Sequence, residues 1–267
     1  MRQRLRRFIR RGLEVTGMIG PLHRRQERRL ARESGDMFDD QRPMPPAELM
    51  AVVSGTAGQA WFSERGRSDA ARFLELAAAH GLDTSGPIDV WDLGCGCGRI
   101  ARWMAPDVIA AGGSFTGSDI NGALVAWCAK SLPGRYFTNR LRPPAKLHAG
   151  SVDLVYAYSV VTHLREKGTR AWLAEVARVL RPGGLALLTF HDEDYASAWG
   201  PPEILPALEH QDYVVWNDAM EGSNYMSTWT TRRYFAEMAT PHFEVLDLMP
   251  GSLEVAVQAV AVLRRPG

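Results

Sequence analysis

Apolar residues along the chain fall either into short continuous runs or into positions spaced as on one face of a helix. We predict short strands at residues 88–93, 114–120, 152–160 and 185–191, the last of which is a nearly continuous apolar run. Helical spacing between them, ended by glycine or proline, predicts helices at residues 68–80, 123–132 and 169–180. We expect the first helix to begin at Ser68, a residue type that favours the N-cap. Apolar strands that alternate with helices indicate a parallel sheet covered on both faces, in a doubly wound α/β fold.

The last quarter of the chain departs from this alternation. Residues 192–230 are rich in aromatic residues, Pro, Asn and Ser without a clear period, and we expect them to form a cap between the fifth and sixth strands. A helix over residues 231–239 and strands over residues 242–249 and 254–263 follow. A tight Pro-Gly turn at residues 250–251 predicts that these two strands are antiparallel, so that the last strand of the sheet is reversed.

Length and composition limit the class of the protein. With 267 residues, 46% of them apolar, the chain can bury the core of one large α/β domain. It has no run of about 18 apolar residues and no apolar signal segment, so we expect a soluble, cytoplasmic protein. Only three cysteines occur, which argues against a disulfide framework.

Charge is concentrated in the N-terminal arm. The net charge is +1, but residues 1–32 contain eleven arginines and two glutamates, a local charge of +9 that leaves −8 for the rest. Leu5, Phe8, Ile9 and Leu13 recur at helical spacing among the arginines, which predicts a basic amphipathic helix. Such a helix could bind anionic lipid, nucleic acid or an acidic partner, or could dock on its own domain or within a homodimer. We favour docking over membrane association, and the sequence leaves these alternatives open.

A glycine-rich loop joins a predicted strand to a predicted helix in the stretch VWDLGCGCGRIARW, residues 90–103. Its glycines have the spacing G-x-G-x-G at residues 94–98, which lets a ligand approach the backbone without meeting a Cβ. Asp92 precedes the loop, and a carboxylate there suits a ligand ammonium better than a phosphate. Asp119 ends the next strand, a position from which a carboxylate accepts hydrogen bonds from ribose hydroxyls. No Gly-Lys-Ser/Thr follows the loop, which excludes a Walker phosphate site.

Four motifs, in this order, resemble those of the class I S-adenosylmethionine-dependent methyltransferases. Residues 92–98 (DLGCGCG) resemble their motif I, and residues 117–120 (GSDI) resemble their ribose-binding motif II. Residues 152–158 are similar to the fourth strand of that family, and residues 175–184 to the helix and turn before the fifth. The resemblance covers roughly residues 45–264. It implies a Rossmann-like, seven-stranded, mostly parallel sheet with a reversed last strand, an N-terminal helical arm and a cap.

The resemblance implies S-adenosylmethionine as the cofactor. The residues expected to bind it lie in the glycine loop and near the ends of the strands: Asp92, Gly94, Cys95, Gly96, Gly98, Asp119, Ile120, Asn139 and Tyr158. The same comparison divides the chain into a basic arm with linker, a cofactor-binding core, a cap for the substrate, and a final helix with two strands. We place these parts at residues 1–45, 46–191, 192–230 and 231–267.

The loop cysteines have two readings. A zinc site needs about four ligands, and the chain offers only Cys128 beyond the pair Cys95 and Cys97. We therefore interpret all three as small side chains packed between strands and helices, with the backbone of the loop as the binding element.

Two histidines follow the strands whose carboxyl ends should meet the cofactor. His163 follows the fourth strand and His191 ends the fifth, and imidazole titrates near working pH, so both are candidate general bases for methyl transfer. Packing beside the cofactor is the alternative for His163. A second use of the cluster is Mg²⁺ binding by His191, Asp192 and Asp194, as in some sugar O-methyltransferases; a solvated acidic loop is the competing interpretation.

The acceptor is indicated only by finer resemblance. No Asn-Pro-Pro-Tyr-like tetrapeptide follows the fourth strand, and no double-glutamate loop is present, which argues against nucleic-acid bases and arginine as acceptors. Further residues resemble bacterial polysaccharide-associated sugar O-methyltransferases, a group that includes the mycobacterial enzymes of methylmannose polysaccharide synthesis. This resemblance implies a sugar or oligosaccharide hydroxyl, with Tyr195 and Trp229 as substrate contacts from the cap. The alternatives are a lipid or phenolic hydroxyl, a small aromatic core within the cap, and a non-catalytic binding protein.

Overall fold

The computed structural model describes residues 40–55, 57–251 and 258–267. The basic helix predicted over residues 1–32 and the beginning of the predicted last strand lie outside these residues. The chain divides into two compact units, residues 1–62 and residues 63–267. The first contains helix α3 (Ala47–Ser54), and all the predicted site residues belong to the second.

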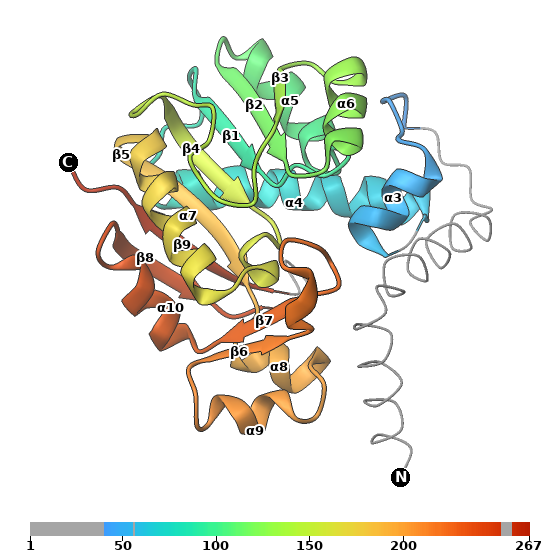
Figure 1. Ribbon diagram of the computed structural model, residues 1–267. Coiled ribbons are helices and arrows are strands. Elements are labelled where there is room, and N and C mark those ends of the chain that lie inside the picture. Colours follow the sequence, from blue (N-terminus) through green and yellow to red (C-terminus); the bar gives the residue numbers. More distant parts are fainter. Residues whose placement is uncertain (1–39, 56, 252–257) are drawn as a thin grey trace. The chain divides into compact units, whose positions relative to one another are not determined.

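A seven-stranded sheet runs through residues 63–267 in the order β3-β2-β1-β4-β5-β9-β8 (Figure 1). The strands β1 to β5 are parallel, whereas β9 is antiparallel to both of its neighbours. This confirms the predicted Rossmann-like sheet with a reversed last strand. The strands are β1 (Asp89–Leu93), β2 (Ser114–Asp119), β3 (Arg135–Thr138), β4 (Val152–Ala157), β5 (Leu180–Phe190), β8 (Glu244–Met249) and β9 (Ala259–Arg264).

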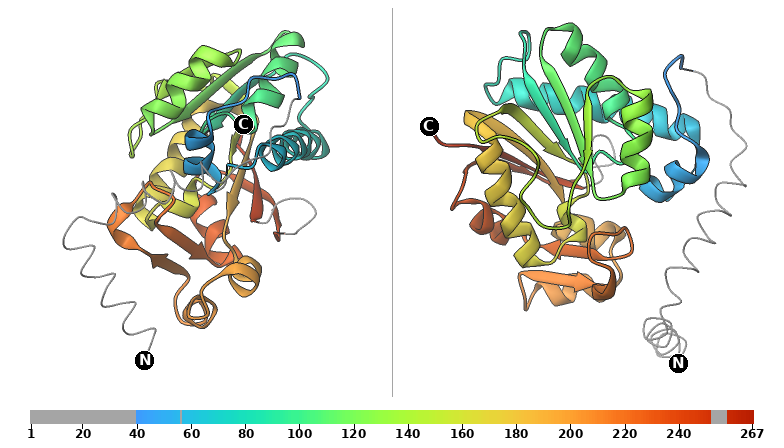
Figure 2. Two further views of the ribbon diagram at one scale, coloured as in Figure 1. Left: turned by 90° about the vertical axis from the view of Figure 1, so that its right-hand side faces the viewer. Right: turned by 45° about the horizontal axis from the view of Figure 1, so that its top comes forward.

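Helices cover both faces of the sheet (Figure 2). Residues of β1, β4 and β5 alternate between the two faces, so each strand contributes to two separate hydrophobic clusters. One cluster includes side chains of α4 (Gln59–Ala79), α5 (Ala101–Ala110) and α6 (Gly122–Ser131). The other includes side chains of α7 (Glu166–Val179) and α10 (Arg232–Ala239). Because the strand order reverses between β1 and β4, the carboxyl ends of these strands flank the expected ligand crevice.

The structure corrects two predicted boundaries and adds one strand. Helix α4 begins at Gln59 rather than at Ser68, because Gly66 does not break it. A Cβ at Gly66 would lie 2.1 Å from the carbonyl oxygen of Arg99, so glycine there permits close packing of the helix against the loop after Gly98. Strand β3 has only four residues and was not predicted. Residues 181–184, predicted as a turn, lie within β5, where Gly183 has a positive φ of 81°.

Residues 192–230 contain helices and a small separate sheet. The elements are α8 (Glu193–Trp199), α9 (Ile204–Leu208), β6 (Tyr213–Trp216), the 3-10 helix η2 (Asp218–Met220) and β7 (Ser227–Thr230). Strands β6 and β7 are antiparallel, and Ile204, Leu208, Val214 and Trp229 are buried together beneath them. Across residues 40–55, 57–251 and 258–267, no helix combines the length and the apolar character needed to cross a bilayer.

Candidate functional site

The glycine loop lies between the end of β2 and the segment that follows β4. The N–H groups of Gly94 and Cys95 donate to the carbonyl oxygen of Ser118, at 2.7 and 2.9 Å. Gly94 has a φ of 82°, and a Cβ there would lie 2.2 Å from Val160 Cγ2. Glycine is therefore required at this position both by the backbone conformation and by the close approach of the β4 end.

Asp119 holds the glycine loop as well as the next turn. Its Oδ2 accepts the Gly96 N–H at 3.0 Å and its Oδ1 accepts the Asn121 N–H at 2.8 Å. Burial raises the pKa of this carboxyl, and its backbone hydrogen bonds counter that effect. The structure thus places Asp119 at the loop, as the sequence predicts for a residue that also reaches the ribose.

The neighbouring predicted residues Ile120 and Asn139 gather at the same edge. Ile120 is 44% exposed, which leaves its side chain available to a ligand. Asn139 follows β3, donates its backbone N–H to the carbonyl oxygen of Asp119 at 2.8 Å, and donates its side-chain amide to Ser118 Oγ at 2.8 Å. Both residues therefore frame the end of β2.

Asp92 is buried at the end of β1, with 3% of its surface exposed. Burial raises its pKa to about 7, an effect that the Tyr156 hydroxyl and the Arg99 guanidinium oppose and the charge of Asp119 reinforces. A cationic group beside Asp92 would stabilise its ionised form.

Arg99 and Asp69 form a contact that the sequence did not reveal. Asp69 on α4 accepts a hydrogen bond from Arg99 at 2.5 Å, and the guanidinium of Arg99 lies 4.6 Å from the centre of the Tyr158 ring. This contact positions Tyr158, a predicted cofactor residue, beside the loop. Asp69 and Arg99 are 30 residues apart, and no local pattern connects them.

The three cysteines are buried free thiols, as predicted. The Sγ atoms of Cys95 and Cys128 lie 3.7 and 3.5 Å from the carbonyl oxygen of Gly96, behind the loop. Burial and the neighbouring Cys128 raise the pKa of the Cys95 thiol, so it stays protonated. Because the Cys95 N–H binds Ser118, this residue contributes the shape of the loop rather than a side-chain contact to a ligand.

His163, the first predicted base, has its ring tautomer determined by one backbone contact. It ends the short 3-10 helix η1 (Val161–His163), and its Nδ1 lies 2.6 Å from the carbonyl oxygen of Met226. Because a carbonyl oxygen only accepts, Nδ1 carries the hydrogen of the neutral ring and Nε2 keeps its lone pair. Burial lowers the pKa of His163, so this neutral form predominates at neutral pH. Its Nε2 lies 3.5 Å from Ser159 Oγ.

His191 has a different environment from the one predicted. It is 5% exposed, its Nδ1 lies 3.1 Å from the carbonyl oxygen of Thr228, and its ring stacks on Tyr195 with centroids 4.0 Å apart. Burial lowers its pKa to about 3, with a contribution from His163. His191 is therefore a buried, weak base, and its hydrogen bond to Thr228 joins β7 to the end of β5. This environment does not favour a catalytic role.

The environment of Trp229 does not favour the predicted substrate contact and agrees with the alternative of a small aromatic core in the cap. Trp229 is 4% exposed and packs with Ile204, Leu208 and Val214 in the core of residues 192–230, so its face is not open to a sugar. Tyr195 stacks on His191 but remains partly exposed, so its other face can still be reached from solvent.

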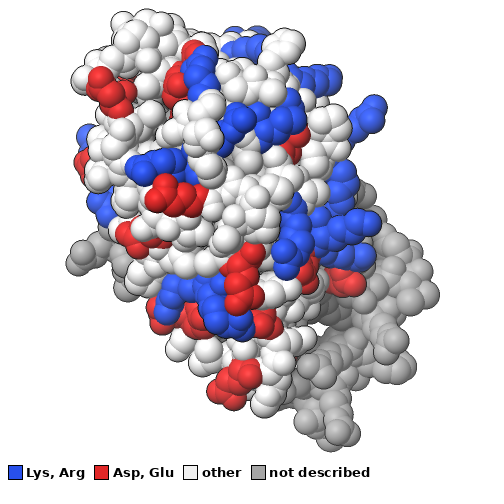
Figure 3. Space-filling model, turned by 90° about the vertical axis from the view of Figure 1, so that its left-hand side faces the viewer, with Lys and Arg blue, Asp and Glu red and all other residues white. Residues whose placement is uncertain are grey.

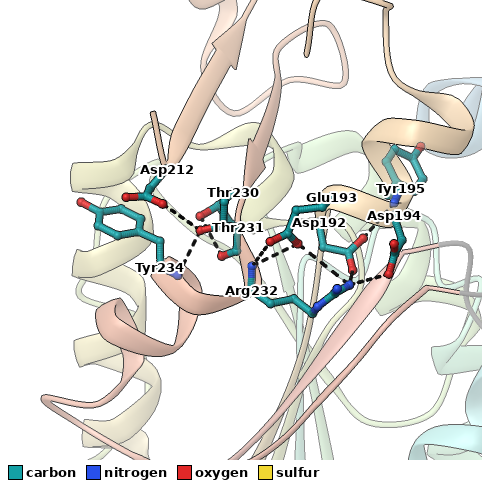
Figure 4. A network of polar contacts seen from close by, with 9 residues as sticks. All are labelled: Asp192, Glu193, Asp194, Tyr195, Asp212, Thr230, Thr231, Arg232 and Tyr234. Carbon is teal, nitrogen blue, oxygen red and sulfur yellow. Dashed lines mark hydrogen bonds and ion pairs between the residues drawn. The ribbon is translucent and has the colours of Figure 1, made fainter. Parts of the chain in front are cut away.

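The predicted metal site at His191, Asp192 and Asp194 does not form, because both aspartates are ion-paired with an arginine. Arg232, at the start of α10, pairs with Asp192 and, at 2.6 Å, with Asp194 (Figure 4). Its backbone N–H donates to both oxygens of Glu193 at 3.2 Å. Within the described part of the chain, no three His, Cys, Asp or Glu side chains are grouped so that they could hold a metal.

The segment of residues 217–226 contacts His163 at two points. The Gly222 N–H donates to the carbonyl oxygen of His163 at 2.8 Å, while Met226 accepts from the ring. Glu221 accepts from the Arg142 side chain at 2.7 and 2.8 Å and from the backbone N–H of Arg165 at 2.9 Å. A Cβ at Gly222 would lie 3.1 Å from Ile120 Cδ1, so this loop reaches the edge that carries Asp119 and Ile120.

Residues 90–184 match a family model described as "Methyltransferase domain". A protein named ribosomal RNA small subunit methyltransferase C, from Alcanivorax borkumensis, is 31% identical over 136 residues. That match covers 48% of this chain and 40% of the relative, so the chain aligns with less than half of the relative's length.

Solved structures of methyltransferases share the fold. A SAM-dependent methyltransferase from Methanosarcina mazei superposes with a TM-score of 0.55 at 17% identity, covering 71% of this chain and 97% of that one. An amino pentose methyltransferase from Micromonospora echinaspora has a TM-score of 0.54 at 19% identity, covering 75% and 91%. Residues 90–184 are therefore similar to a methyltransferase domain, and the seven-stranded sheet with its reversed strand β9 has the class I methyltransferase fold.

Proposed function

We propose that this protein transfers a methyl group from S-adenosylmethionine to an acceptor hydroxyl, on a sugar of an oligosaccharide or polysaccharide. The observation that carries the proposal is His163, whose Nδ1 is fixed by the carbonyl oxygen of Met226. Its Nε2 lone pair is then free for a proton at the carboxyl end of β4, next to the glycine loop.

The residues at the glycine loop suit this cofactor. Asp119 and Asn139 are polar groups at the end of β2, where ribose hydroxyls would be held, and the exposed Ile120 offers an apolar contact for the adenine. The ammonium of the cofactor would keep Asp92 ionised, although burial alone raises its pKa to about 7. When bound, the cofactor supplies a methyl group on a positively charged sulfonium.

His163 acts as the general base in this proposal. The acceptor hydroxyl gives up its proton as its oxygen attacks the methyl carbon in line with the departing sulfur, and His163 Nε2 takes up one proton in this step. The neutral thioether that leaves needs no proton, so one base is enough. Arg232 already neutralises Asp192 and Asp194, and the mechanism therefore assigns no step to a metal.

RNA is the second candidate acceptor, because of the ribosomal RNA methyltransferase to which the chain is similar. Residues 156–159, at the end of β4, read Tyr-Ala-Tyr-Ser and lack the Asn-Pro-Pro-Tyr pattern of enzymes that methylate base amines. Basic and acidic side chains are intermixed on the face shown in Figure 3 rather than forming a continuous basic surface there. We therefore favour the hydroxyl acceptor.

The test is methyl transfer from labelled S-adenosylmethionine to a panel of mannosides, rhamnosides, lipid glycans, small phenols and ribosomal RNA. We expect transfer to a glycan hydroxyl, at a rate that chelation leaves unchanged. His163→Gln keeps a neutral side chain but removes the base, and it should lower kcat by 10²-fold or more. Transfer only to RNA, or full activity of His163→Gln, would overturn the proposal.

A further inference from the structure

Ser159, two residues after the end of β4, has an unusual backbone conformation. It is not glycine, yet its φ is 60°, in the left-handed region that such residues seldom adopt. Its backbone N–H donates to Thr189 Oγ1 on β5 at 2.7 Å, which holds the segment in this conformation. Strain of this kind persists only where the surroundings enforce it, and it concentrates at functional sites.

A closed ring of hydrogen bonds determines the direction in which Ser159 presents its hydroxyl. Because Thr189 Oγ1 accepts from Ser159, its own hydrogen goes to Gln258 Oε1, 2.6 Å away. This contact orients the amide of Gln258, so that its Nε2 donates to Ser159 Oγ at 2.8 Å. Thr189 is fully buried and Gln258 is 7% exposed, and both groups depend on this ring for their hydrogen bonds within the described residues.

The hydrogen of the Ser159 hydroxyl then has two acceptors within reach. Thr162 Oγ1 lies at 3.0 Å and His163 Nε2 at 3.5 Å. Gln258 uses one lone pair of Ser159 Oγ. When the hydroxyl turns its hydrogen from Thr162 to His163, its second lone pair is free to accept from another hydroxyl.

We propose that Ser159 relays the acceptor's proton to His163, with Gln258 and Thr189 as positioning residues; this rests on the proposed hydroxyl methylation. In the step, the acceptor O–H bond breaks and its proton goes to Ser159 Oγ, while the Ser159 hydrogen passes to His163 Nε2. The acceptor oxygen forms a bond to the methyl carbon, and the carbon–sulfur bond breaks with its electron pair on sulfur. The imidazolium of His163 later loses its proton to solvent.

The location of Ser159 is consistent with this role. The next residue, Val160, packs directly on Gly94, so Ser159 lies beside the glycine loop at the switch point of the sheet. Ser159 is partly exposed, whereas the other hydroxyls of the network, Thr162 and Thr189, are buried. Among these three, the Ser159 hydroxyl is the one that an acceptor can reach.

The test compares Ser159→Ala with Thr169→Val, which removes a buried hydroxyl that bonds to Tyr213 outside the relay. We expect Ser159→Ala to lower kcat by 10²-fold or more, with the affinity for S-adenosylhomocysteine within twofold of wild type by calorimetry. Thr169→Val should retain kcat within threefold. A proton inventory in mixed H₂O and D₂O should be curved for wild type, because two protons move, and linear for Gln258→Leu.

A second readout does not need turnover. With S-adenosylhomocysteine bound, the ¹⁵N signal of His163 Nε2 should shift in Ser159→Ala, which lacks the donor, while the Nδ1 signal stays in place. An unchanged Nε2 signal, or full kcat in Ser159→Ala, would overturn the relay. If Ser159→Ala is fully active while His163→Gln is not, only the relay fails; if both are fully active, the proposed function fails as well.

Discussion

At the scale of single residues, burial decides which groups can carry charge at the site. Asp92 and His191 are both almost fully buried, and burial shifts each pKa toward the neutral form, to about 7 and about 3. His163 has its pKa lowered as well, but the residue stays partly exposed and its Nε2 lies within reach of the Ser159 hydroxyl. The three side chains have titratable groups in one small region, and their surroundings give them different uses.

The first prediction concerns Asp92→Asn. The folded-state pKa of about 7 lies above the ordinary value of 3.8, so the folded protein binds this proton more tightly than the unfolded chain does. The resulting stabilisation is complete below about pH 4 and is lost as the pH rises to about 7. Relative to Asp92→Asn, wild type should therefore lose about 4 kcal/mol of unfolding free energy over this window.

Urea unfolding at half-unit pH steps measures this difference, and calorimetry measures cofactor affinity on the same samples. We expect Asp92→Asn to be the more stable protein at pH 8 and to bind S-adenosylmethionine at least tenfold more weakly, because the ammonium loses its carboxylate. A pH-independent difference in stability would show that Asp92 does not titrate in this range.

At the scale of elements, one arginine joins the end of β5 to the beginning of α10. Asp192 has no exposed surface, caps α8 by accepting the Tyr195 N–H at 2.9 Å, and pairs with Arg232. Thr231 caps α10 in the same way by accepting the Tyr234 N–H (Figure 4). Ion pairs and helix caps therefore join the two ends of the insertion, residues 192–230, where it leaves β5 and where it enters α10.

The second prediction is that Arg232→Met lowers the free energy of unfolding by about 3 kcal/mol, because it leaves the buried Asp192 without its cation. Burial raises the pKa of Asp192 and Arg232 holds it down, so the loss should be larger at pH 8 than at pH 5. Urea unfolding at the two pH values tests this.

The neighbouring Arg233 is the matched control for Arg232. Its side chain is 63% exposed and pairs with Asp212 and Glu237, which are also accessible to solvent. Exposed pairs contribute little, so Arg233→Met should leave the free energy of unfolding nearly unchanged. Equal losses in the two variants would contradict a special role for Arg232.

At the scale of the whole molecule, the arginine-rich segment and the proposed cofactor site lie in different parts of the sequence. Residues 1–32 have a charge of +9, whereas the proposed cofactor residues lie between Asp92 and Tyr158. The third prediction is that a chain beginning at residue 40 binds S-adenosylmethionine within twofold of the full chain, by calorimetry. The same truncation should reduce retention on heparin, because it removes eleven of the 31 Lys and Arg residues and leaves a chain with a net negative charge. A large loss of cofactor affinity would mean that the arm takes part in the site.

The sequence alone was sufficient for the local parts of this protein. Short strand-like segments between helical ones predicted β1, β2, β4 and most of β5. Glycine spacing with Asp92 and Asp119 predicted the loop, because these features depend on neighbouring residues. The edge strand β3 was missed because four residues are too few to show a period. The first two turns of α4 were missed because the contact that favours glycine at residue 66, with Arg99, is distant in sequence.

Tertiary structure decided the chemistry around the loop. Sequence could not distinguish His163 from His191, because their burial and partners come from Met226 and Thr228 on a distant segment. The acids that suggested a metal are neutralised by Arg232, about 40 residues further along the chain. Gln258 reaches Ser159 across 99 residues. The sequence determined where a cofactor loop would form, whereas long-range packing determined which side chains beside it remain open to a substrate.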